Sequence, residues 1–92
     1  MTTKDRIEQI LKSQLKIAFL EIIDDSAKHA GHSAQAQEGE SHFSIIVVSD
    51  DFEGMPLVKR HKMIYDALKI QMSQQIHALS IKALTSREYK SS

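Results

Sequence analysis

The chain contains no cysteine among its 92 residues. It therefore cannot form a disulfide or a thiolate metal site of its own, and its stability has to come from packing. A chain of this length has room for one core, so we expect a single domain spanning residues 1–92. Hydrophobic residues make up 41% of the sequence and charged residues 26%, a balance typical of a folded chain.

Three short apolar segments predict β-strands. Residues 17–23 (I-A-F-L-E-I-I) and 42–48 (H-F-S-I-I-V-V) are rich in β-branched and aromatic residues and should pair as antiparallel neighbours. Residues 76–84 (I-H-A-L-S-I-K-A-L) alternate in polarity, so His77 should share the apparent core face of the third strand with Leu79 and Ile81.

Two segments have helical periodicity. Residues 4–15 carry apolar side chains at helical spacing, after a capping-box pattern formed by Thr2 and Asp5. Residues 56–72 begin with the only proline and form a clear amphipathic stripe, with a bend near His61 as one way to divide it into two helices.

The predicted fold class is α+β, with the order α-β-β-α-α-β and a three-stranded mixed sheet. A right-handed crossover places the third strand parallel to the second and packs the helices on one face of the sheet. The ordered core should extend over about residues 4–86, and the polar tail T-S-R-E-Y-K-S-S should fray, either directly or after one turn of helix.

Composition and missing motifs narrow the function. Twelve basic and twelve acidic residues cancel, which disfavours tight nucleic-acid binding except through a local basic face. The sequence has no nucleophile-elbow, phosphate-loop, dinucleotide or zinc-protease motif, so we do not expect an enzyme. It also shows no signal peptide or membrane-spanning run, which favours a cytoplasmic protein without membrane contact.

The histidines are the candidate ligands. His29 and His32 lie in an unusually long polar connection over residues 25–40, and His42 follows at the start of the second strand. Their spacing permits a transition metal, but solvated loop histidines are more common. His77 is equally compatible with a ligand and with a partly buried strand end, whereas His61 favours a buried structural role.

Two other clusters carry weaker signals. Asp24 and Asp25 are adjacent carboxylates at a strand end, where turn formation is the more common role. The basic run V-K-R-H-K at residues 58–62 offers phosphate contacts through Lys59, Arg60 and Lys62, although such runs are usually the solvated side of a helix.

Five segments, taken together and in order, resemble the BolA-like proteins. They are D-D-S-A-K-H-A-G-H at 24–32, E-S-H-F at 40–43, F-E-G at 52–54, V-K-R-H-K-M-I-Y at 58–65 and I-H-A-L-S-I-K at 76–82. The long histidine-bearing loop is similar to the BolA subtype of the family. The resemblance implies a fold related to the type II KH domain, but without the G-x-x-G nucleotide clamp.

The resemblance also implies a partner and a cofactor. BolA-like proteins of this kind pair with monothiol glutaredoxins and share a bridging [2Fe–2S] cluster in iron–sulfur trafficking or iron and redox regulation. The glutaredoxin and bound glutathione supply thiolates, and the BolA-like chain supplies the histidine that maps to His77 and a loop ligand that maps to His29. His32 and His42 are weaker candidates for the loop ligand.

A second function class stays open beside this one. BolA-like proteins are also linked to transcriptional control of morphology and stress responses, and residues 56–72 could bind DNA through Lys59, Arg60 and Lys62. The sequence is compatible with a homodimer. An enzymatic role has no nucleophile or redox thiol to support it.

Overall fold

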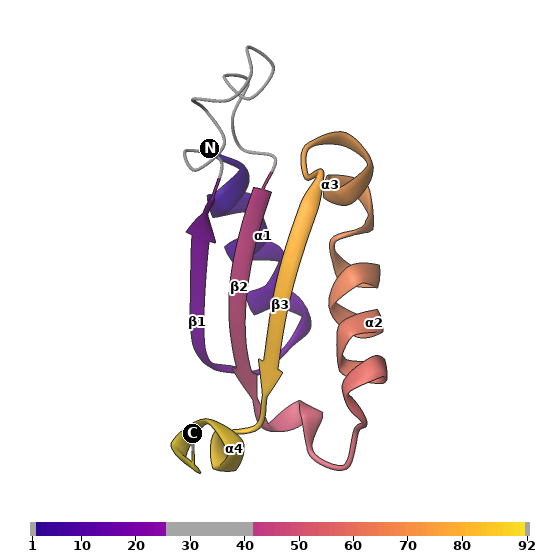
Figure 1. The fold of residues 1–92 in the computed structure, drawn as a ribbon. Coiled ribbons are helices and arrows are strands. Elements are labelled where there is room, and N and C mark those ends of the chain that lie inside the picture. Colours follow the sequence, from indigo (N-terminus) through magenta and orange to yellow (C-terminus); the bar gives the residue numbers. More distant parts are fainter. Residues whose placement is uncertain (1, 26–41, 92) are drawn as a thin grey trace.

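The computed structural model describes residues 2–25 and 42–91. In it a three-stranded sheet in the order β1-β2-β3 lies beside the helices (Figure 1). The elements are α1 (Thr3–Gln14), β1 (Ile17–Asp24), β2 (His42–Ser49), the 3-10 helix η3 (Asp50–Phe52), α2 (Leu57–Ala67), α3 (Lys69–Gln74), β3 (Ala78–Leu84) and α4 (Ser86–Ser91).

The predicted pairing of the strands is confirmed. β1 pairs with β2 antiparallel, and β2 pairs with β3 parallel. The ends of the three strands therefore lie together at two opposite ends of the sheet. We call the end where β1 finishes and β2 and β3 begin the loop end, and the opposite end the far end.

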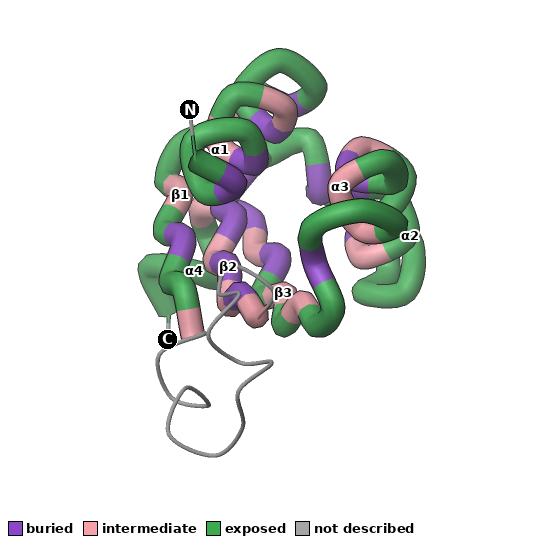
Figure 2. Tube along the Cα trace, turned by 90° about the horizontal axis from the view of Figure 1, so that it is seen from above, coloured by how far each residue is buried: buried purple, intermediate pink, exposed green. Residues whose placement is uncertain are grey.

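The core lies between one sheet face and the helices α1, α2 and α3, as the predicted layering requires (Figure 2). On β2 the inward side chains Phe43, Ile45 and Val47 are buried, and Ile7 and Ile64 face them from the helices. Burial of such side chains is worth about 1.5–3 kcal/mol each, so this layer dominates stability. Among the residues described, no helix is long and apolar enough to cross a membrane.

Local chemistry sets where the first helix begins. The Thr2 hydroxyl accepts a hydrogen bond from the Asp5 N–H at 3.1 Å, and the Asp5 carboxylate accepts one from the Thr2 N–H at 3.3 Å. The predicted capping box is thus confirmed, and it satisfies two of the free N–H groups at the helix start.

The second helical segment divides later than expected. The break falls at Leu68, whose backbone angles of φ −101° and ψ 18° end α2, and not near His61. Leu68 is fully buried there, so the change of direction turns α3 while keeping this side chain in the core.

The C-terminal tail differs most from its prediction. Residues expected to fray form α4, which packs on the sheet face opposite α1 and α2 (Figure 2). Tyr89 stacks on Phe19 with ring centroids 5.2 Å apart, and the outward-facing Val48 is 1% exposed. The tail is ordered because it covers this second apolar strip.

Candidate functional site at the loop end of the sheet

Parallel pairing of β2 and β3 brings two histidines to the same end of the sheet. The register aligns His42 with Ala78, so His77 lies one residue before the aligned position. The two imidazole rings are 6.5 Å apart between centroids and nearly perpendicular, at 83°. These side chains come from distant parts of the sequence and meet only because of the fold.

His77 is positioned by its neighbour. The N–H of Ile76 donates to the carbonyl of Gln71 at 2.9 Å, and the Ile76 side chain is buried in the core. β3 therefore begins at Ala78, and His77 lies exposed in the bend before it. The prediction that His77 shares the core face of the strand is wrong, because Ile76 takes the buried place.

Asp25 links the end of β1 to His42. Its N–H donates to the His42 carbonyl at 2.7 Å, and its carboxylate accepts a hydrogen bond from the Ser44 hydroxyl. A pocket of about 220 Å³ lies beside this link, and its lining includes Ser80 of β3. Turn formation was predicted for Asp25, and in the described residues it holds the backbone of a candidate ligand.

Other histidine predictions have different outcomes. His29 and His32 lie outside the described residues. His61 is half-buried on α2 instead of buried. Within residues 2–25 and 42–91, no group of three or more histidine, aspartate or glutamate side chains is arranged to hold a metal ion. A metal bound by the described histidines would therefore need further ligands.

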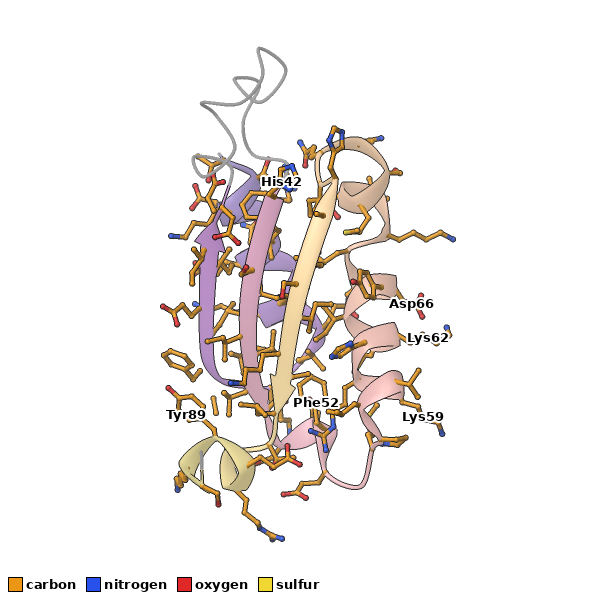
Figure 3. All side chains as sticks on the ribbon, viewed as in Figure 1. His42, Phe52, Lys59, Lys62, Asp66 and Tyr89 are labelled. Atoms are coloured by element: carbon orange, nitrogen blue, oxygen red, sulfur yellow. The ribbon has the colours of Figure 1, made fainter. Side chains whose placement is uncertain are left out.

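The basic residues of α2 differ in how far they are buried. Lys59 and Lys62 are exposed and point away from the sheet (Figure 3). Arg60 is 6% exposed, so its expected place on the solvated side of the helix is wrong. It precedes the buried Ile64 by four residues and therefore lies on the same side of the helix.

The side-chain contacts of Arg60 lie at the far end of the sheet. Its guanidinium donates to the carbonyls of Met55 (2.8 Å) and Ala83 (3.1 Å) and lies over the Phe52 ring, with its carbon 5.9 Å from the ring centroid. It also forms a two-pronged ion pair with Glu88 at 2.6 and 3.2 Å. Arg60 is a structural residue.

Glu88 closes this network at the start of α4. It accepts a hydrogen bond from the Thr85 N–H at 2.9 Å, while its own N–H donates to the Thr85 hydroxyl at 3.2 Å. The hydrogen bond from Arg60, followed by that from the Thr85 backbone, lowers the pKa of Glu88 from 4.5 to about 2. The pattern T-S-R-E is a capping-box signature, which is the sequence signal for the missed helix.

Comparisons with known proteins agree with this architecture. The family model described as BolA-like protein matches residues 11–88. Over 87 residues the chain is 45% identical to SufE-like protein 1, chloroplastic/mitochondrial, of Arabidopsis thaliana, covering 90% of this chain and 24% of that protein. Over 90 residues it is 36% identical to the DNA-binding transcriptional regulator BolA of Escherichia coli (strain K12), covering 98% and 82%.

A solved structure supports the same assignment. The BolA domain of SufE1 from Arabidopsis thaliana superposes with a TM-score of 0.81 and 43% sequence identity, covering 96% of this chain and 98% of that chain. The chain thus corresponds to nearly all of that domain but to about a quarter of the SufE-like protein's whole length.

Proposed function

The chain belongs to the BolA-like family, and from this premise we propose that it is a non-enzymatic partner of a monothiol glutaredoxin. The two proteins would share a bridging [2Fe–2S] cluster in iron–sulfur trafficking or in iron and redox regulation. The observation that carries the proposal is the pairing of His42 and His77 at the loop end, with ring centroids 6.5 Å apart.

The donor set fits such a cluster. Two neutral imidazoles on one iron and two thiolates on the other form a ligand set known from Rieske centres. This chain has no cysteine, so both thiolates would come from the glutaredoxin and its bound glutathione. His77 is the first proposed ligand from this chain, because it is exposed and follows directly from the buried Ile76.

The second ligand is proposed from the connection between β1 and β2. His29 occupies the position that the family resemblance indicates, and His42 is the candidate that lies beside His77. His32 is a further donor in the same connection. Asp25 would support His42 by holding its carbonyl oxygen.

Reconstitution tests the proposal. The full chain is mixed with a monothiol glutaredoxin, glutathione, iron and sulfide, and the complex is isolated for absorbance, circular dichroism, and iron and sulfide analysis. We expect a cluster-loaded heterodimer whose spectrum changes in His77→Ala. His61→Ala is the matched control, because this half-buried histidine lies on α2, away from the loop end. An unchanged spectrum in His77→Ala rejects this residue as a ligand.

Variants at His29, His32 and His42 then identify the second ligand. The residue whose replacement by alanine changes the spectrum in the same way as His77→Ala is the partner. The complex should also lose its cluster as the pH falls below about 6–6.5, because protonated imidazole does not bind iron. A cluster equally stable at pH values of about 5 and 8 would argue against two histidine ligands.

A second candidate function is supported by the name of the Escherichia coli relative, DNA-binding transcriptional regulator BolA. Under this alternative α2 contacts the phosphate backbone through Lys59 and Lys62, since Arg60 is buried. Gel shifts at several salt concentrations test it. Lys59→Ala with Lys62→Ala should weaken DNA binding and lower the slope of its salt dependence by about two. No retardation at low salt would exclude this function.

A further inference from the structure

An open groove of about 640 Å³ lies between the end of α1 and the outward side of α2. The less exposed residues of its lining are the apolar residues Leu15, Met55 and Ala67. Met63, which is 36% exposed, adds a fourth apolar side chain. The volume falls within the range of about 300–1,000 Å³ typical of binding pockets. Two of these four side chains are methionines, which adapt their shape to different apolar partners.

The charged lining of this α1–α2 groove is dominated by lysine. Lys59 and Lys62 line it one helical turn apart, and Lys59 forms no ion pair among the contacts found in the described residues. Lys62 pairs with Asp66 at 2.9 Å, but both side chains are highly exposed. Such a pair contributes about 0–1 kcal/mol and exchanges readily for another carboxylate.

The start of α2 adds positive potential near Lys59. The helix is capped by Pro56, which offers no side-chain hydrogen bond, and its first turn contains no acidic residue. The partial positive charge of the helix N-terminus is therefore not neutralised by its own side chains. The groove combines an apolar centre with an electropositive border.

We propose that the α1–α2 groove docks an acidic amphipathic helix of a partner protein. Apolar anchors spaced three or four residues apart would enter between Leu15 and Met63, and flanking carboxylates would pair with Lys59 and Lys62. The apolar lining favours a protein over DNA, because phosphates gain nothing from contact with methionine and leucine side chains.

This surface is separate from the histidine site. Leu15 lies two residues before β1, which begins at the far end, whereas His42 and His77 lie at the loop end. The groove is lined by residues of α1 and α2 and of the segments next to them, and by none of the three strands. A helix bound there would leave both histidines accessible, so the proposal does not depend on cluster binding.

Nuclear magnetic resonance titration of the full chain tests the proposal. The probe is a synthetic amphipathic helix of about 15 residues with leucine on one face and glutamate on its flanks, long enough to present several anchors. We expect amide shifts concentrated at residues lining the groove and affinity that falls with added salt. A peptide of the same composition with scrambled leucines, and one with lysine in place of glutamate, should bind at least about tenfold more weakly.

Variants locate the binding surface. Met63→Glu and Lys59→Glu should each weaken the glutamate peptide by about tenfold or more, because each adds like charge at the groove. Ile70→Glu and Lys82→Glu are the matched controls, since both residues are exposed and neither lines the groove, and they should bind as the wild type does. All four substitutions change exposed side chains, and a thermal melt of each variant checks that it is folded.

Several results would overturn the proposal. Equal binding of the lysine peptide would remove the charge argument, and unchanged binding by Met63→Glu would remove the groove. A DNA duplex that shifts the groove amides when the peptide does not would assign the surface to nucleic acid. Sedimentation showing a wild-type dimer that Met63→Glu disperses would assign it to a second copy of the chain.

Discussion

The polar side chains at the two ends of the sheet differ in burial and in hydrogen bonding. At the far end the Arg60 guanidinium is buried and donates hydrogen bonds to Met55, Ala83 and Glu88. At the loop end His77 is exposed and His42 is half-buried. A polar group committed to the fold has its hydrogen bonds satisfied internally, whereas one available to a partner remains accessible. The contrast assigns the buried Arg60 network at the far end to stability and the accessible histidines at the loop end to binding.

The largest effect is expected from Arg60→Met. The substitution leaves the carbonyls of Met55 and Ala83 without their donor and removes the ion pair with Glu88. Breaking a buried pair costs about 3–5 kcal/mol, but Glu88 is partly exposed, so we expect about 2–4 kcal/mol in the free energy of unfolding. Urea denaturation measures it.

Lys59→Met is the control for this substitution. It also replaces a cationic side chain with methionine, one residue earlier on the helix, but at an exposed position. Its effect should stay within about 0.5 kcal/mol. Equal effects of the two substitutions would contradict the structural role of Arg60.

Glu88→Gln should have a smaller effect, because the amide oxygen can still accept hydrogen bonds from Arg60 and Thr85. The folded-state pKa of Glu88 is lowered from 4.5 to about 2. The carboxylate therefore contributes stability above pH 4.5, and this contribution is lost as the pH falls toward 2. Stability measured across this range should fall more steeply in the wild type than in Glu88→Gln.

A matched variant isolates this pH effect. Glu21→Gln changes the net charge equally, but at an exposed position on β1. It should retain the slope of the wild type that arises from Glu88. Parallel curves for the wild type and Glu88→Gln would mean that the ion pair with Arg60 does not form in solution.

The docking of α4 on the open sheet face should appear as an energetic coupling between Phe19 and Tyr89. Their stacked rings predict a coupling energy of about 0.5–1.5 kcal/mol in a double-mutant cycle with alanine. A control cycle of Phe19 with Tyr65, which lies on α2 and donates to the Leu79 carbonyl, should give a value near zero. Loss of the first coupling would indicate that α4 frays after all.

The sequence predicted the elements better than the contacts between them. The three strands, their pairing and the Thr2–Asp5 cap follow from local pattern and chain connectivity, and all are confirmed. The phase of α2 was misread because His61 was expected to be buried and Arg60 to be solvated. Arg60 occupies that side because Glu88, 28 residues later, supplies its counter-charge. No local pattern contains that information.

The candidate site shows the same limit. Each histidine is visible in the sequence, but the proximity of His42 and His77 depends on the register of β2 against β3. Asp25 was interpreted as a turn former, since its link to His42 arises only once the strands pair. The helix α4 was the avoidable error, because Thr85 and Glu88 carry a recognisable cap.

The smallest effect on stability is expected from His77→Ala, and this makes it the sharpest test of the contrast between the two ends. The side chain is exposed in a bend, so its removal should change the free energy of unfolding by no more than about 0.5 kcal/mol. Under the proposed function, the same variant should also lose iron and sulfide when it is reconstituted with a monothiol glutaredoxin. A stability loss above about 1 kcal/mol would place His77 among the residues that hold the fold. Loss of the cluster from a variant as stable as the wild type would support a role for His77 in binding and none in stability.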